Sequence, residues 1–91
     1  MREVPYIRAV EPAGDFALIV SFGDGSSGLW RAAIEQWKGP MAVPLQDPAY
    51  FASAFCEDGA VAWENGYDAS PEAIWQELKA AGALSYATYA A

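Results

Sequence analysis

One ten-residue stretch, WENGYDASPE at 63–72, constrains the fold more than any other part of the chain. Asn65-Gly66 is typical of a tight turn, because both residue types tolerate a positive φ angle. Ser70 occupies the position of a helix N-cap, and Pro71 follows at the first helical position, where its missing N–H costs no hydrogen bond. We therefore predict that a strand ends at the tryptophan, that the chain turns sharply, and that a helix begins at Pro71.

Hydrophobic patterns in the rest of the chain predict an α+β domain. The segment FALIVSF is apolar on both faces, which is typical of a central strand. Asp47-Pro48 repeats the N-cap and proline signal and predicts a second short helix. We expect one small antiparallel sheet of four to five strands with two or three short helices packed on it. The strands are expected at 4–11, 16–22, 29–32, 55–57 and 60–63, and the helices at 32–37, 48–52 and 71–81.

More specific expectations follow for the N-terminal half. Val4, Tyr6 and Val10 are expected to share one face of the first strand. The sequence GDGSSG at 23–28 is expected to be a flexible hairpin connection. Residues 41–45 are expected to be extended or irregular, because proline disfavours an α conformation in the residue before it.

The C-terminal part of the chain is expected to hold the last helix and a short tail. Ile74, Leu78 and Ala81 have the spacing of a buried helix face, and Gly82 is expected to end that helix. The tail at 83–91 leaves three outcomes open, which are an added edge strand, packing onto the core, or fraying.

Length and composition indicate one domain over residues 1–91. Hydrophobic residues make up 54% of the chain, enough for a core without disulfides or metal. The single cysteine, Cys56, cannot form an intramolecular disulfide, and we interpret it as a small core residue. The N-terminus lacks the apolar segment of a signal peptide, and no apolar run reaches the roughly 20 residues of a membrane helix. A cytoplasmic protein without membrane contact is expected.

The charge balance is acidic, with 12 Asp and Glu against 5 Lys and Arg and a net charge of -7. This sign disfavours direct binding to nucleic-acid phosphates. No basic residue lies between Lys38 and Lys79. Two interpretations stay open, a solvated acidic surface that maintains solubility and an acidic patch that meets a basic partner. The acidic residues in this span are Asp47, Glu57, Asp58, Glu64, Asp68, Glu72 and Glu77.

Three motifs carry a resemblance to a known family. They are FGDG at 22–25, PLQDP at 44–48 followed by YF at 50–51, and WENGYD at 63–68 followed by SPE at 70–72. At this spacing the chain, over residues 4–78, resembles a bacterial and phage family of domains of unknown function, the one numbered twenty-four forty-two. The chain departs from the family pattern at Trp30-Arg31, where an acidic residue is usual, at Glu64, where proline is usual, and after Gly82.

The resemblance implies a small α+β domain without an established enzymatic activity. Family members resemble small stand-alone proteins or accessory domains, which are sometimes encoded beside suspected toxin–antitoxin partners. That neighbourhood suggests protein binding, by analogy alone.

The sequence argues against most catalytic chemistry. The chain has no histidine, which removes Ser–His and Cys–His pairs and the commonest zinc ligand. Glu57 and Asp58 give Cys56 an acidic setting, opposite to that of a reactive thiolate. The 23–28 loop lacks the Lys-Ser or Lys-Thr of a phosphate-binding loop and the distal glutamate of a calcium loop. We expect no enzyme activity, no cofactor and no metal.

Three carboxylates near the last helix are the best candidates for an enzymatic or metal-binding site, as the alternative to a non-catalytic protein. Glu64, Asp68 and Glu72 could bind a divalent ion or perform acid–base work if they converge in a pocket. The favoured interpretation is that they are exposed acids at the positive end of a helix.

Tryptophan is unusually frequent, with four in 91 residues. Most are expected in the core. Trp30 and Trp37 are the candidates for exposed anchors, because they flank a short helix and Trp is enriched in binding hot spots.

These observations give one main hypothesis, a non-catalytic interaction module that binds and restrains a basic protein or ribonucleoprotein partner. It would act like an antitoxin, or like a phage inhibitor such as an anti-CRISPR protein that imitates nucleic-acid charge. Two alternatives are a metal-dependent or acid–base enzyme and a structural homodimer. The predicted partner-binding residues are Trp30, Trp37, Glu64, Asp68, Glu72 and Glu77.

Overall fold

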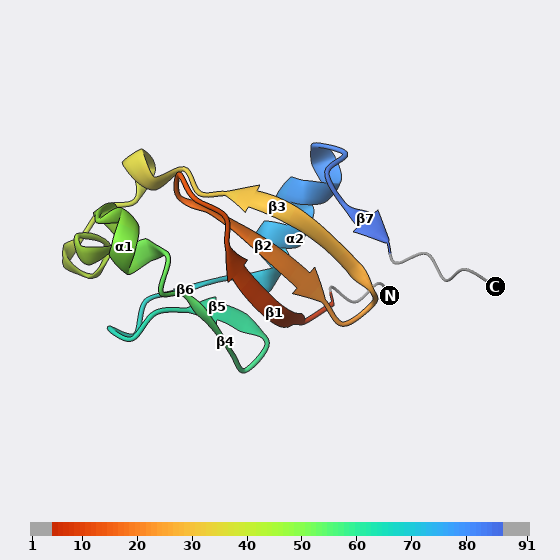
Figure 1. Ribbon diagram of the computed structural model, residues 1–91, viewed down its shortest axis with the longest axis horizontal. Coiled ribbons are helices and arrows are strands. Elements are labelled where there is room, and N and C mark those ends of the chain that lie inside the picture. The colour runs from red at the N-terminus through yellow and green to blue at the C-terminus, as the bar shows by residue number, and fades with distance from the viewer. Residues whose placement is uncertain (1–4, 87–91) are drawn as a thin grey trace.

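The computed structural model describes residues 5–86, which form two antiparallel sheets, two α-helices and three 3-10 turns (Figure 1). The four-stranded sheet has the order β1-β2-β3-β7, and the three-stranded sheet has the order β4-β5-β6. The predicted α+β class is confirmed, with the strands divided between two sheets. The strands are β1 (Ile7–Pro12), β2 (Ala17–Phe22), β3 (Ser26–Arg31), β4 (Phe55–Glu57), β5 (Ala60–Ala62), β6 (Asp68–Ala69) and β7 (Ser85–Tyr86). The helices are α1 (Pro48–Phe51) and α2 (Pro71–Ala80), and the 3-10 turns are η1 (Ile34–Gln36), η2 (Pro40–Ala42) and η3 (Pro44–Gln46).

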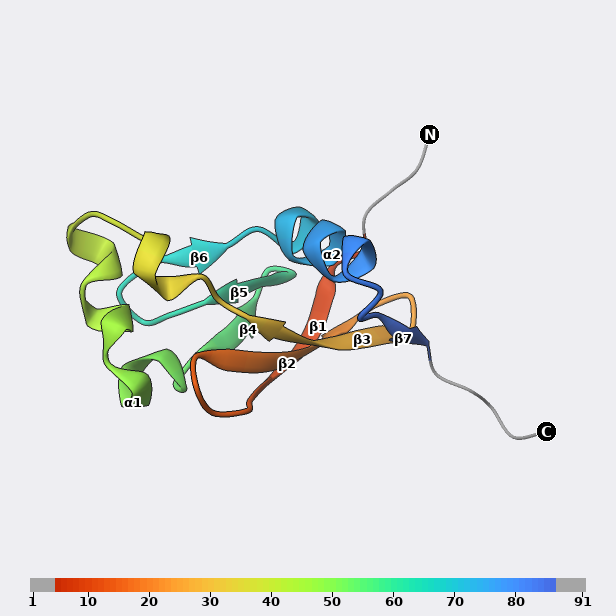
Figure 2. The ribbon, with the colours of Figure 1, turned by 90° about the horizontal axis from the view of Figure 1, so that it is seen from above.

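The core lies on one side of the four-stranded sheet, where α2 and the second sheet pack (Figure 2). β2 runs between β1 and β3, as predicted for a central strand. Its residues Leu18, Val20 and Phe22 point to the core and are fully buried, whereas Ile19 points away and is 40% exposed. The side chains that oppose them are Val61, Trp63, Ile74, Trp75 and Leu78.

β1 contains a bulge that changes which side chains are buried. Its pairing with β2 shifts register between Ile7 and Ala9, which leaves Arg8 as an extra residue. Ile7 is buried and Tyr6 is 59% exposed. The prediction that Tyr6 and Val10 share one face is therefore wrong, because the bulge between them interrupts the alternation of side chains and only Val10 packs against the core. Val4 lies outside the described residues.

The connection between β2 and β3 is tighter than predicted. β3 already begins at Ser26, so only residues 23–25 form the turn. The Asp24 side chain accepts hydrogen bonds from the backbone N–H and the hydroxyl of Ser26, which is 1% exposed. A local side-chain bond of this kind stabilises the turn. The predicted hairpin connection is therefore confirmed, but the expected length of 23–28 is too long.

The segment after β3 is a chain of short helical turns. Pro40 and Pro44 each open a 3-10 turn, because a proline at the first helical position has no N–H to satisfy. The segment expected to be extended or irregular at 41–45 is thus not extended and consists mostly of 3-10 turns. The predicted helix at Pro48 is confirmed, and Asp47 caps it by accepting the N–H of Ala49 at 3.1 Å.

The stretch at 63–72 forms the predicted turn and helix start, with one element that the sequence reasoning missed. Trp63 and Tyr67 close the turn through an N–H···O bond of 2.9 Å, and Gly66 takes a φ of 93°. The chain then forms β6, which pairs with β5, before α2 begins. The Ser70 hydroxyl caps α2 by accepting the N–H of Ala73 at 3.3 Å.

α2 ends as a Schellman motif. Gly82 has a φ of 68°, and the N–H of Ala83 donates to the Leu78 carbonyl at 2.8 Å. The predicted helix end at Gly82 is thus confirmed. Ile74 and Leu78 are buried as predicted, but Ala81 is exposed, and it is the C-cap residue that follows the last helical residue, Ala80.

The described part of the tail follows one of the three outcomes that the sequence left open. β7 joins the four-stranded sheet as an edge strand by pairing with β3. Where the chain crosses back over β3, Gly28 leaves no room for a side chain, since a Cβ there would lie 2.9 Å from the Ala83 carbonyl oxygen. Residues 87–91 of the predicted tail lie outside the described residues.

Within residues 5–86 no helix has the length and hydropathy that crossing a membrane requires.

Candidate functional site

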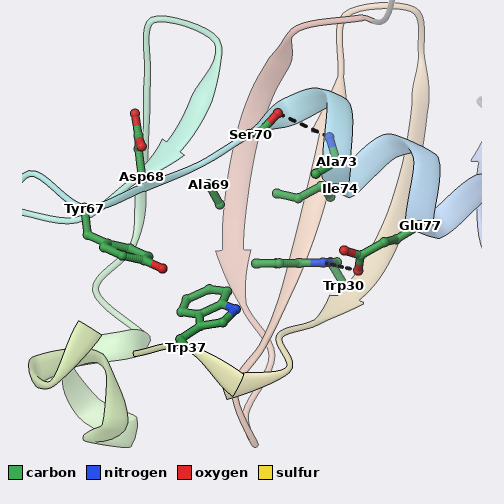
Figure 3. A pocket seen from close by; sticks show the side chains of 9 residues that line it. All are labelled: Trp30, Trp37, Tyr67, Asp68, Ala69, Ser70, Ala73, Ile74 and Glu77. Atoms are coloured by element: carbon green, nitrogen blue, oxygen red, sulfur yellow. Dashed lines mark hydrogen bonds between the residues drawn. The ribbon is translucent and has the colours of Figure 1, made fainter. Parts of the chain in front are cut away.

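A pocket of about 210 Å³ lies between β3, η1, β6 and the first turns of α2 (Figure 3). Three aromatic side chains and two carboxylates line it, together with small and apolar residues. Four of the six predicted partner-binding residues meet here, although they come from segments that lie far apart in the sequence. The lining residues are Trp30, Trp37, Tyr67, Asp68, Ala69, Ser70, Ala73, Ile74 and Glu77.

Trp30 forms a buried wall of the pocket. It pairs with Leu18 across β2 and β3, which turns its side chain toward the core and leaves it 5% exposed. The prediction that Trp30 is an exposed anchor is therefore wrong. Its indole N–H donates to Glu77 Oε1 at 3.1 Å, so a core residue holds this carboxylate of α2 at the pocket (Figure 3).

Trp37 is the centre of an aromatic cluster. It is half-buried, and its ring centroid lies 5.9 Å from that of Trp30, 5.4 Å from Tyr67 and 6.1 Å from Trp63. Contacts between aromatic rings at such distances stabilise the fold beyond the contribution of the surface area that the rings bury. Trp37 also lines a second pocket of about 210 Å³ beside η2 and is not a freely exposed anchor. It presents part of a rigid ring surface to both pockets.

Tyr67 is a lining residue that the sequence reasoning did not select. The hairpin between β5 and β6 places Tyr67 and Ala69 on the pocket side, because side chains alternate along a strand. Figure 3 shows the Tyr67 hydroxyl directed toward Trp37 and Trp30, whereas the Asp68 carboxylate points away from the rings, at the rim. The tight turn followed by strand alternation was the signal that could have identified Tyr67.

Glu64 and Glu72 lie outside this pocket. Both are exposed, so the structure does not bring them together with Asp68 as the enzyme alternative requires. Among the described residues, no group of three or more His, Cys, Asp or Glu side chains is placed to hold a metal ion.

Cys56 lies on the exposed strand β4. Its thiol donates a hydrogen bond to the Ile7 carbonyl at 3.0 Å, and the residue is exposed. Our interpretation of Cys56 as a core residue is wrong, because β4 is an edge strand of the smaller sheet.

The electrostatics of the pocket favour a cation. Asp68 and Glu77 line it, and none of its lining residues, all in the described part of the chain, is Lys or Arg. The start of α2 is a poor anion site, because Pro71 has no N–H and Ser70 already occupies the N–H of Ala73. The pocket therefore combines aromatic surface with negative charge.

No family model, no curated protein and no solved structure matches the chain. The resemblance to the family numbered twenty-four forty-two stays a prediction based on the three motifs.

Proposed function

We propose that this chain is a non-catalytic module that binds and restrains a basic protein partner, with the pocket between β3, β6 and α2 as its anchor point. The observation that carries the proposal is the composition of that pocket, which combines three aromatic rings and two carboxylates and has no basic lining residue. Aromatic rings and carboxylates both attract cations.

The size of the pocket favours a side chain over a free metabolite. Its volume is about 210 Å³, below the roughly 300–1,000 Å³ that is usual for small-molecule sites. An anchor residue of a partner surface, inserted into such a pocket, is a common form of binding hot spot.

The charge of the whole chain supports the same class of partner. A net charge of -7 attracts basic surfaces at long range and accelerates their association, most strongly at low salt. A basic nucleic-acid-binding protein is a suitable target, and both an antitoxin and a phage inhibitor that imitates nucleic-acid charge would act on one. The proposal includes a cytoplasmic location, where such partners work.

The proposal is tested by affinity capture from host lysate with low-salt and high-salt washes, followed by affinity measurements with the purified partner. Two triple variants raise the net charge by the same three units. The site variant is Asp68→Asn, Glu72→Gln and Glu77→Gln, and the control is Glu11→Gln, Glu35→Gln and Glu57→Gln, all exposed and none lining the pocket.

We expect a basic partner that elutes with salt. The site variant should bind it about tenfold more weakly, because three charge interactions of about 0.5 kcal/mol each sum to that factor. The control should stay within about twofold of the wild type. Equal losses in both variants would show that only net charge matters, and unchanged affinity in both would refute the acidic-surface proposal.

A further inference from the structure

We infer that the pocket receives a single arginine side chain of the partner, with the guanidinium between the Trp37 and Tyr67 rings and the Glu77 carboxylate. This inference rests on the proposed function and specifies the chemistry of its anchor.

The first step in the argument is the position of Glu77. This residue is exposed on α2, yet its Oε1 is held by the indole N–H of Trp30 at 3.1 Å. Within residues 5–86 its other oxygen, Oε2, receives no hydrogen bond, so it can accept one from a ligand. Because Trp30 is buried in the core, the carboxylate is already ordered before binding, which lowers the entropy that a ligand must overcome.

The second step is the aromatic surface opposite that carboxylate. Trp37 and Tyr67 lie with ring centroids 5.4 Å apart at an interplanar angle of 38° and line one side of the pocket. The Tyr67 hydroxyl points toward the middle of the pocket and can accept an N–H there (Figure 3). An aromatic wall facing a fixed carboxylate matches a planar cation with several donors.

Arginine fits this arrangement better than lysine. Guanidinium is planar, stacks on aromatic rings, presents five N–H donors and is more weakly hydrated than an ammonium group. Lysine would bring a compact, strongly hydrated charge that uses the aromatic wall poorly. Asp68 at the rim adds negative charge near the entrance, where the stem of the arginine and the partner backbone would lie.

The experiment titrates the full chain, labelled with ¹⁵N, with three peptides that differ at one position. The peptides are acetyl-Gly-Arg-Gly-amide, its citrulline analogue, which keeps the shape without the charge, and its lysine analogue. The readout is the set of indole N–H signals, assigned through Trp→Phe variants. We expect the arginine peptide to shift the Trp37 and Trp30 signals, the lysine peptide to bind at least threefold more weakly, and the citrulline peptide to cause no saturable shift.

A matched pair of variants tests whether the Glu77 carboxylate supplies the charge that binds the guanidinium. Glu77→Gln removes the charge while its amide oxygen can still accept from Trp30, so the fold is kept. Glu11→Gln makes the same change at an exposed position of β1 outside the pocket. Arginine-peptide affinity should fall about tenfold in the first variant, because a hydrogen bond to a charged group contributes about 1.5 kcal/mol, and stay within twofold in the second.

The outcomes separate this inference from the proposed function. If a basic partner is captured with salt-sensitive binding but the arginine peptide shifts neither indole signal, the arginine pocket is wrong and the proposed function stands. Equal binding of the citrulline peptide, or equal losses in Glu11→Gln and Glu77→Gln, would also overturn the inference. If neither a partner nor the arginine peptide binds, both proposals fail.

Discussion

The close packing of α2 against β3 gives a stability prediction that can be worked out from two glycines. Gly28 and Gly23 both lack a left-handed φ, so neither position is strained by a side chain as such. At Gly28 a new Cβ would lie 2.9 Å from the Ala83 carbonyl oxygen and 3.1 Å from Leu78 Cδ1. At Gly23 the Cβ would overlap the ring of Tyr6 more severely.

The two substitutions should nevertheless rank in the opposite order to their overlaps. The obstacle at Gly28 is backbone and a buried leucine, and overpacking of this kind costs about 1–3 kcal/mol. Replacing glycine by alanine in a strand otherwise raises the free energy of unfolding by about 0.5–1 kcal/mol. Gly28→Ala should therefore destabilise by about 1–2 kcal/mol. Gly23→Ala should cost less than 0.5 kcal/mol, because the 59% exposed Tyr6 ring can rotate away.

Urea unfolding followed by tryptophan fluorescence measures both free energies of unfolding, and calorimetry gives the melting temperatures. For a domain of this size the Gly28→Ala cost corresponds to a decrease in Tm of about 5–15 °C. If Gly23→Ala is as destabilising as Gly28→Ala, the cost depends only on how closely the new Cβ approaches its neighbours. The argument that the exposed Tyr6 ring can move aside, whereas backbone cannot, is then refuted.

Two further predictions concern the stretch at 63–72. Ser70→Ala should lower the free energy of unfolding by about 1 kcal/mol, because α2 loses its N-cap. Ser70→Asp restores an acceptor and should recover most of that loss in the same urea assay. Equal losses in the two variants would contradict a capping role for Ser70. Asn65→Ala removes a bond of 2.9 Å from Nδ2 to the Met41 carbonyl and one of 3.1 Å from the Tyr67 N–H to Oδ1. It should cost about 1–2 kcal/mol and accelerate amide hydrogen exchange in the η2 region, whereas unchanged exchange there would show that Asn65 does not hold that segment.

Features that depend on a few neighbouring residues could be predicted from the sequence. Ser70 and Asp47 accept N–H groups within three positions of themselves, and Gly82 takes the left-handed φ that ends α2. Because the relevant atoms are close along the chain, residue type alone selects these conformations. The central position of β2 followed from its two apolar faces for a similar reason.

The candidate site could be predicted only in part. Trp37, Asp68 and Glu77 were selected for their chemistry, and the structure brings them to one pocket. Trp30 was selected as an exposed anchor and is instead a buried wall. Tyr67 was missed: alternation places it on the same side as Ala69, but which side faces the pocket follows from the pairing of β6 with β5.

Residues close along the chain therefore specify the turn at Asn65-Gly66, the helix caps and the acidic character of this protein. Contacts between distant residues specify the partition into two sheets, the exposed place of Cys56 and the bulge at Arg8. The bulge depends on how β1 aligns with β2, and the sheet partition depends on which strands pair. Both are set by contacts between residues distant in the chain, each of which must overcome the entropy of closing a loop. The pocket belongs to this second group, since its walls meet only after α2 has packed on β3.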